Sequence, residues 1–265
     1  MRALLLALLS LLSVPRTGST DDVTVFAAAS LAEALEEVAR GYEQASGNKV
    51  ILNVGGSNDL ARQIVAGAAA DLFFSADRAQ MDLVETAGLV RPADRVELLS
   101  NVLVVVVPAA AATRIASPRD LTHLRRIAVA DPEAVPAGVY ARSYLETAGL
   151  WAVLQPRVIP TLNVRAALAA VESGNADAGI VYRTDAALSR RVRIAFTVPR
   201  EQGPKIVYVL APLASSRKPA TIELARRLAG PEGRSVFEKH GFVIEPGGAA
   251  SHPLEPPLAS SAAAK

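Results

Sequence analysis

The sequence contains no cysteine among its 265 residues. It can therefore form no disulfide, offers no thiol nucleophile, and has no cysteine to which a lipid could be attached after removal of an export signal. Histidine is scarce as well, since only His123, His240 and His252 occur and they lie far apart in the sequence. A metal site or a Ser-His-Asp site is therefore not expected.

Motifs of nucleotide binding and hydrolysis are also missing. No Walker loop occurs, no Gly-x-Gly-x-x-Gly follows the first predicted strand, and no Gly-x-Ser-x-Gly marks a nucleophile. Lysine and arginine form no stripe with interleaved aromatic residues, which argues against binding to nucleic acid. We therefore expect a protein that is not an enzyme and has no resident cofactor.

A long hydrophobic run occurs once, at the start of the chain. Residues 1–20 begin with Arg2, continue through leucines and alanines to Val14 and end in a polar stretch, as a cleavable export signal does. The run is short for a membrane span, so we expect a free periplasmic protein. Removal of this leader takes Arg2 and Arg16 from the 28 basic residues and leaves 26 against 26 acidic ones.

Short apolar strands alternate with amphipathic helices after the leader. The first strand starts at Val23, and the helix behind it has apolar residues from Leu31 to Tyr42 at the spacing of one buried face. Runs at 49–54 and 70–77 are further strands, each leading into a helix. This alternation predicts an α/β fold with mostly parallel sheets, in which ligands bind beyond the carboxyl ends of the strands.

The length of the chain favours two lobes over one core. Residues 101–108 are the most β-prone run and are interpreted as the crossing into a second lobe, whereas residues 205–210 are predicted to rejoin the first sheet. After Pro246 the chain is rich in Ala, Pro and Ser and has no apolar period, which predicts disorder. The predicted segments are a leader at 1–20, a first lobe at 21–100 with 200–245, a second lobe at 101–199 and a tail at 246–265.

Four predicted helix starts follow strand ends, two in each lobe: Ser30, Ser57, Ala137 and Val164. First-turn N–H groups have no partner inside the helix and the helix dipole is positive there, so such positions can bind an anion. Ordinary helix capping explains them too, since Ser30 and Glu33 spell a capping box. Closure of two lobes would bring the four helix starts together.

Other residues at strand ends leave a similar choice. Tyr182 ends the predicted strand at 178–182, where its hydroxyl either reaches the same rim or is buried in the core of the lobe. Asp77, Asn163 and the pair Thr184-Asp185 stand where they are expected to cap the helices that follow.

Five segments together carry a family resemblance: FAAASL at 26–31, LARQI at 60–64, ADLFFSAD at 70–77, DPEAVPAG at 131–138 and GIVY at 179–182. They resemble the periplasmic molybdate-binding proteins of bacterial ABC importers, in the same order, from about residue 23 to residue 244. The resemblance implies a two-lobed type II periplasmic binding fold that closes on molybdate or tungstate and delivers it to a membrane permease. We expect the protein to be a monomer.

The resemblance also implies how the oxyanion is bound without any cationic side chain. Ser30 and Ser57 would each donate from hydroxyl and N–H, Ala137 and Val164 from N–H, and Tyr182 from its hydroxyl. Glu33 and the pair Gly55-Gly56 depart from the family pattern. We expect Glu33 to cap Ser30 in the open form and to release that donor when the lobes close.

Other functions fit the sequence less well. Another tetrahedral oxyanion, such as sulfate or thiosulfate, stays open as the ligand because only cavity size would separate it from molybdate. The same bilobal fold serves in transcription regulators and in the porphyrin-pathway deaminase, but a regulator needs a helix-turn-helix and no export signal. The deaminase carries its cofactor on a cysteine, which this chain lacks. A sensor or scavenger without a permease also remains open.

Overall fold

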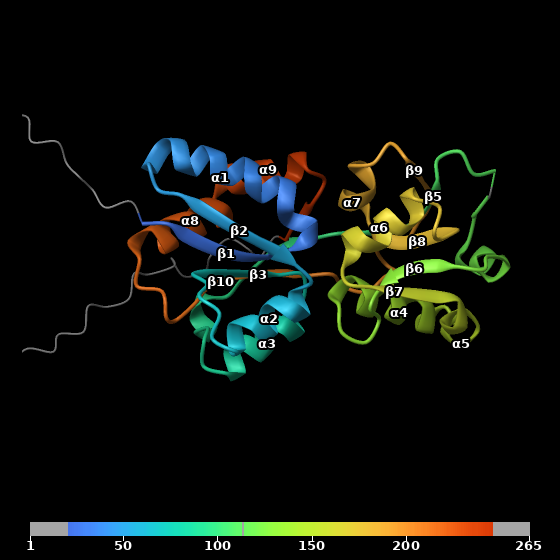
Figure 1. Cartoon of the computed structure of the whole chain (residues 1–265), viewed down its shortest axis with the longest axis horizontal. Coiled ribbons are helices and arrows are strands. Elements are labelled where there is room, and N and C mark those ends of the chain that lie inside the picture. Colours follow the sequence, from blue (N-terminus) through green and yellow to red (C-terminus); the bar gives the residue numbers. More distant parts are fainter. Residues whose placement is uncertain (1–20, 113, 246–265) are drawn as a thin grey trace, which may run out of the picture.

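A computed structural model describes residues 21–112 and 114–245. The predicted leader at 1–20 and tail at 246–265 lie outside these residues. The chain forms two mixed sheets with helices on both faces, and the two halves lie side by side (Figure 1). The α/β, two-lobed architecture expected from the sequence is thereby confirmed, although antiparallel strands take a larger part in both sheets than expected.

The first sheet has the strand order β11-β4-β10-β3-β1-β2. Its parallel strands are β1 (Val23–Ala28), β2 (Val50–Gly55) and β3 (Leu72–Ser75). Its other strands are β4 (Val96–Ser100), β10 (Tyr208–Pro212) and β11 (Val243–Ile244). Strand β10 runs antiparallel to both β3 and β4. Thus the late strand predicted to rejoin the first sheet does so.

Helices cover both faces of the first sheet (Figure 1). One face carries α1 (Ala32–Ser46), α8 (Pro219–Ala229) and α9 (Pro231–Lys239), and the other carries α2 (Ser57–Val65) and α3 (Arg78–Thr86). Short 3-10 turns lie at η1 (Ala29–Leu31) and η2 (Pro92–Asp94). The apolar spacing that predicted α1 buries Leu35, Val38 and Tyr42.

The second sheet has the strand order β7-β6-β8-β5-β9. Its strands are β5 (Leu103–Pro108), β6 (Ile127–Ala130), β7 (Val158–Thr161), β8 (Ala178–Tyr182) and β9 (Val192–Thr197). Its helices and turns are η3 (Pro118–His123), α4 (Pro136–Thr147), α5 (Trp151–Leu154), η4 (Gln155–Arg157), α6 (Val164–Glu172) and α7 (Arg183–Ala187). Strands β6, β7 and β8 are parallel, and β5 is antiparallel to β8 and β9.

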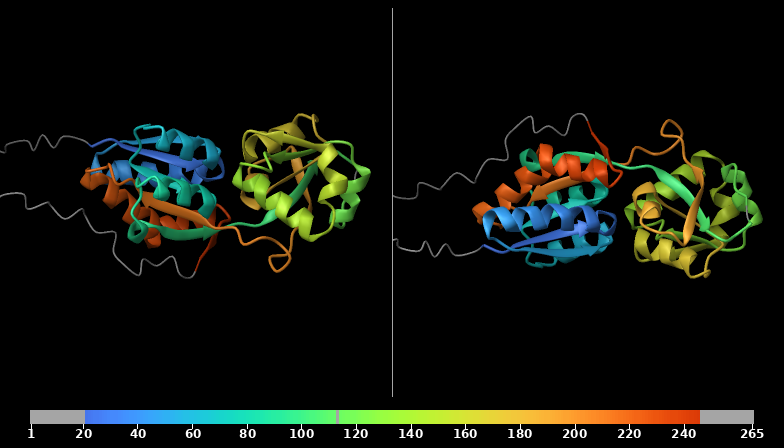
Figure 2. Two further views of the ribbon diagram at one scale, coloured as in Figure 1. Left: turned by 90° about the horizontal axis from the view of Figure 1, so that it is seen from below. Right: turned by 90° about the horizontal axis from the view of Figure 1, so that it is seen from above.

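Two segments cross between the sheets (Figure 2). Asn101 and Val102 connect β4 to β5, and residues 198–207 connect β9 to β10. The hydroxyl of Ser100 donates to the carbonyl of Ile206 at 2.7 Å and so joins the two crossings.

Strand β4 was not predicted, although buried Val96 and Leu98 flank exposed Glu97 in the alternation typical of a strand.

Three predicted helix caps have different outcomes. Asp77 and Asn163 cap α3 and α6 as expected, because each side chain accepts a first-turn N–H at 3.0 Å, from Gln80 and Ala166 respectively. The cap predicted at Thr184-Asp185 is wrong. Helix α7 begins one residue earlier, and the carboxylate of Asp185 is fully buried inside the protein.

Candidate anion-binding site

The sheet register places the two serines at one edge of the first sheet. Strands β1 and β2 are parallel, and Ala28 at the end of one pairs with Gly55 at the end of the other. Ser30 and Ser57 each follow two residues after this paired position. Both serines, and the helix starts they belong to, therefore lie beyond the carboxyl ends of neighbouring strands.

The second sheet repeats this arrangement. Strand β6 lies between β7 and β8 and is parallel to both. Ala137 is in the first turn of α4, after β6, and Val164 opens α6, after β7. Tyr182 is the last residue of β8. These three residues therefore share one edge of the second sheet, as the serines do in the first.

One cavity between the lobes is lined by all five residues predicted to bind the ligand. Ser30, Ser57, Ala137, Val164 and Tyr182 are each buried, with at most 4% of their surface exposed. The space available to the centre of a water molecule is about 10 Å³, so the cavity in this state is small. None of the described residues that line it carries a charge.

Ser57 presents its hydroxyl hydrogen to the cavity. Its Oγ accepts the backbone N–H of Ala76 at 3.0 Å, in the loop after β3. Since this hydroxyl already accepts from the protein, its own hydrogen remains for a ligand. Ser57 also opens α2, so its N–H has no carbonyl partner within the helix.

Tyr182 has a buried hydroxyl for which the described residues supply no hydrogen-bond partner. Burial raises the pKa of Tyr182 well above its usual range, so the hydroxyl keeps its hydrogen. A buried polar group without a partner costs about 1 to 3 kcal/mol. This hydroxyl in the cavity is therefore suited to donate to an acceptor bound there.

The close contacts at the start of α4 explain why a glycine, Gly138, stands there. A Cβ atom at this position would lie 2.0 Å from the carbonyl oxygen of Ala130 and 2.4 Å from that of Asp131. Only glycine allows the helix start to lie this close to the end of β6. The contact holds Ala137, one residue earlier, at the cavity.

The capping box predicted for Ser30 and Glu33 does not form. A 3-10 turn intervenes after β1, so α1 begins at Ala32 and has no side-chain cap. Glu33 instead forms a bidentate ion pair with the guanidinium of Arg165, which lies in α6 of the other lobe. The expectation that Glu33 would cap Ser30 is therefore wrong for this state of the protein.

Arg165 links Glu33 to the buried Asp185. Its Nε atom lies 2.5 Å from Oδ1 of Asp185, whose side chain is completely buried. Burial raises the pKa of Asp185 from its usual 3.8 to about 7, and the charge of Glu33 also raises it, while Arg165 opposes both effects. The three side chains form an ion cluster that joins the lobes next to Val164.

The buried Asp185 makes stability depend on pH. Its folded-state pKa of about 7 exceeds the usual 3.8, so the folded state binds this proton more tightly and is favoured most at low pH. The free energy of unfolding should therefore fall between about pH 4 and pH 7, by on the order of 1 kcal/mol or more. Denaturant unfolding at several pH values measures this slope. Asp185→Asn should flatten it, and equal slopes in both proteins would contradict the assignment.

A larger cavity of about 290 Å³ lies at the crossings between the lobes. It is lined by Asn101, Arg200 and Lys205, among others, and contains none of the four helix starts. Glu245 also lines it and pairs with Arg200. All four helix starts line the smaller cavity, which we therefore take as the candidate site.

The described residues place no group of three or more His, Cys, Asp or Glu side chains where they could share a metal ion. In residues 21–112 and 114–245 no helix is long and apolar enough for a membrane span. Two α/β lobes with helix starts converging on an uncharged cavity are the architecture of a two-lobed receptor for a small solute.

The chain belongs to the bacterial extracellular solute-binding proteins, because the model of that family matches residues 23–243. The molybdate-binding protein ModA of Escherichia coli is 40% identical over 229 residues, which cover 84% of this chain and 89% of that protein.

Two solved structures show the same fold. The periplasmic molybdate-binding protein of Azotobacter vinelandii has a TM-score of 0.75 at 24% identity, covering 84% of this chain and 99% of that one. The sulfate-binding protein SubI of Mycobacterium tuberculosis has a TM-score of 0.75 at 20% identity, covering 86% and 89%. At these identities the likeness concerns the fold alone.

Proposed function

We propose that the chain is the substrate-binding component of an ABC importer and binds molybdate, and also tungstate, as the tetrahedral oxyanion. The observation that carries this proposal is the uncharged buried cavity on which Ser30, Ser57, Ala137, Val164 and Tyr182 converge. The 40% identity to the ModA protein of Escherichia coli supports molybdate as the oxyanion.

Each lobe would contribute donors to the bound oxyanion. Ser30 and Ser57 would donate from hydroxyl and N–H, Ala137 and Val164 from N–H, and Tyr182 from its hydroxyl. Hydrogen bonds to a charged group contribute about 1.5 to 3 kcal/mol each. Seven such bonds offset the desolvation of the anion and the closure of the lobes, and leave enough free energy for a submicromolar Kd.

The donors also select the protonation state of the ligand. A monohydrogen phosphate ion would bring an O–H group into a cavity whose groups donate, and this O–H would be left without an acceptor. Such an unpaired donor costs about 1 to 3 kcal/mol, which corresponds to roughly 5- to 150-fold in affinity. Sulfate carries no proton and so brings no unpaired donor into the cavity. The size of the cavity would distinguish it from molybdate.

The same proposal covers the protein's place in the cell. An export leader at 1–20 would direct the chain to the periplasm, where it would act as a monomer and deliver the oxyanion to a membrane permease. The lobes at 21–100 with 200–245 and at 101–199 would open to admit the ligand and close around it. Membership of the extracellular solute-binding family supports this arrangement.

Calorimetric titration of residues 21–265 with molybdate, tungstate, sulfate and phosphate tests the proposal. We expect submicromolar Kd values for molybdate and tungstate, and an affinity for sulfate at least about 100-fold lower, a difference of about 2.7 kcal/mol. Absence of molybdate binding would overturn the proposal. Equal or tighter binding of sulfate would replace molybdate with sulfate as the ligand.

Gly56 offers a separate test, because the lobes meet closely at this residue. A Cβ there would lie 3.0 Å from the carbonyl oxygen of Leu162 in the other lobe and 2.6 Å from Oδ1 of Asn58. Gly56→Ala should hold the lobes apart and weaken molybdate binding about tenfold, since overpacking costs about 1 to 3 kcal/mol. Gly55→Ala is the matched control, as its Cβ would meet only Leu60 at 3.6 Å. Equal affinities of the two variants would contradict the close approach.

A further inference from the structure

The hydroxyl of Ser30 has a protein partner that comes from a distant part of the chain. Its Oγ lies 2.9 Å from Oη of Tyr208, the first residue of β10, and either oxygen could donate in this pair. Both side chains are buried. The direction of this hydrogen bond decides whether Ser30 can donate its hydrogen to a ligand or must accept one from it.

Asn101 determines that direction. Its Oδ1 accepts the backbone N–H of Val102 at 2.9 Å, and because an N–H can only donate, the oxygen of the amide must face it. The Nδ2 group therefore faces Oη of Tyr208 at 3.3 Å and Oγ1 of Thr184 at 2.9 Å. An amide nitrogen can only donate, so the Tyr208 oxygen accepts from Asn101.

The hydrogen of Tyr208 is then directed to Ser30. Asn101 Nδ2 cannot accept, so among the described residues Ser30 Oγ is the acceptor that remains for the buried Tyr208 O–H. When Tyr208 donates to Ser30 Oγ, the hydrogen of Ser30 is left for the cavity. Ser57 reaches the same state with the Ala76 N–H as its donor. Burial also raises the pKa of Tyr208 far above its usual range, so it keeps the hydrogen that this chain of bonds requires.

We propose that Asn101 and Tyr208 are positioning residues that orient the Ser30 hydroxyl as a donor to the oxyanion and thereby favour oxyanions without a proton. This inference rests on the proposed function. Asn101 lies in the crossing from β4 to β5, and its amide bonds Tyr208 of one lobe and Thr184 of the other. The chain of bonds therefore runs from the crossing to the ligand.

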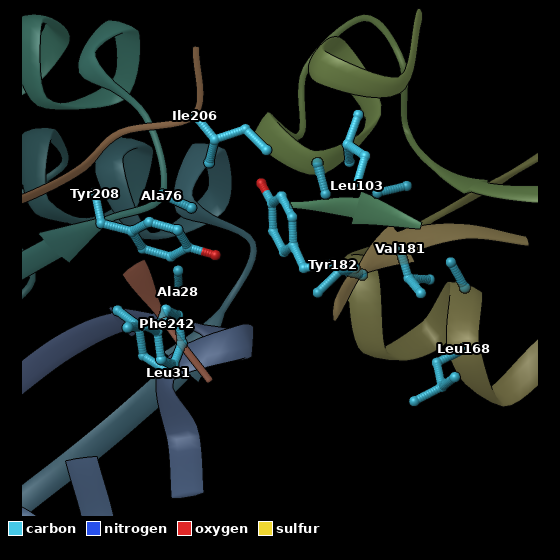
Figure 3. Close-up of a cluster of buried hydrophobic side chains, with 14 of the residues drawn as sticks. Ala28, Leu31, Ala76, Leu103, Leu168, Val181, Tyr182, Ile206, Tyr208 and Phe242 are labelled. Carbon is cyan, nitrogen blue, oxygen red and sulfur yellow. The ribbon is translucent and has the colours of Figure 1, made fainter. Parts of the chain in front are cut away.

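The packing of Tyr208 is compatible with a conservative test. Its ring reaches toward that of Tyr182 from the opposite lobe (Figure 3), with 5.9 Å between ring centroids. It also packs edge-on against Phe242 at 5.5 Å. Tyr208→Phe keeps both ring contacts and removes only the hydroxyl, so it isolates the hydrogen bond to Ser30.

The test is a double-mutant cycle read by calorimetry with molybdate. Tyr208→Phe should weaken binding about 3- to 10-fold, as expected for loss of one hydrogen bond, and Ser30→Ala about 10- to 100-fold. In the Ser30→Ala background, Tyr208→Phe should change the affinity less than about twofold, because it acts through Ser30. Tyr42→Phe is the control, since its hydroxyl bonds Ala220 in the same lobe away from the cavity.

The preference for molybdate over phosphate is a measurement that a purely structural role of Tyr208 and Asn101 would leave unchanged. At about pH 8 phosphate is mainly a dianion that carries one proton and has the same charge as molybdate. Tyr208→Phe should narrow the preference for molybdate over phosphate, because Ser30 Oγ is then free to accept the phosphate O–H. Asn101→Asp should narrow it further, since a carboxylate takes the Tyr208 hydrogen and turns Ser30 toward Tyr208 as a donor.

The outcomes separate this inference from the proposed function. A wild-type protein that binds no molybdate overturns the function itself. A wild type that binds, together with an equal loss from Tyr208→Phe with and without Ser30, overturns only the positioning role. An unchanged preference for molybdate over phosphate in both Tyr208→Phe and Asn101→Asp also overturns it.

Discussion

Replacing both cavity serines, Ser30→Ala with Ser57→Ala, should lower molybdate affinity about 100- to 10,000-fold. In the proposed complex each hydroxyl would donate a hydrogen bond to a doubly charged ligand, and two such bonds together contribute about 3 to 6 kcal/mol. The cavity has no charged side chain among its described lining residues that could compensate for their loss. Calorimetry on the double variant measures the effect directly.

The control for this result is a second pair of serines outside the cavity. Ser46 in α1 donates to the carbonyl of Tyr42, and Ser173, which directly follows α6, donates to the carbonyl of Ala170. Ser46→Ala with Ser173→Ala should leave the affinity unchanged. If the cavity variant bound molybdate within about threefold of the wild type, a difference of about 0.7 kcal/mol, the serines would not be ligands.

Gly138→Ala should lower the free energy of unfolding by about 3 kcal/mol or more. The new Cβ would lie 2.0 Å from the backbone oxygen of Ala130, which cannot move aside as the end of a side chain can. The start of α4 would have to leave β6, and Ala137 would move from the cavity with it. The variant should therefore be less stable in denaturant unfolding and should also bind molybdate more weakly.

Gly41→Ala is the matched control for this substitution. Gly41 lies inside α1, and its new Cβ would meet the guanidinium of Arg227 at 3.1 Å, the mobile end of a side chain. Alanine in a helix interior is favoured over glycine by about 0.5 to 1 kcal/mol. A Gly138→Ala protein as stable as Gly41→Ala would show that the close approach of α4 to β6 is not required.

The sequence predicts those features of this protein that follow from local rules. Apolar periodicity is sufficient to place α1 and the strand β1 before it. The caps at Asp77 and Asn163 follow from residue type and position. The positions of Ser30 and Ser57 after paired strand ends also follow from the βα pattern. For these features the physical cause lies within a few residues of the effect.

Features that depend on distant residues could not be predicted in this way. Ser30 and Glu33 satisfy the local pattern of a capping box, but Arg165 of the other lobe binds Glu33 and Tyr208 binds Ser30. Asp185 stands where a cap is common, yet it is buried against Arg165. Each partner is far away in the sequence, so no pattern of neighbouring residues indicates it.

The donor direction at Ser30 is the clearest case of this difference. Tyr208 stands in an apolar stretch of sequence, where a tyrosine is as consistent with core packing as with a polar role. Its role becomes visible only when Asn101 and Ser30 are placed beside it. The signal in the sequence is a tyrosine in an apolar stretch that directly follows the segment crossing between the lobes.

The most direct test of the central claim is a crystal structure with molybdate, in which anomalous scattering locates the molybdenum. The account predicts one strong peak in the small cavity, within hydrogen-bonding reach of the oxyanion from Ser30, Ser57 and Tyr182. A strongest peak in the larger cavity beside Arg200 and Lys205, or no peak between the lobes, would contradict it.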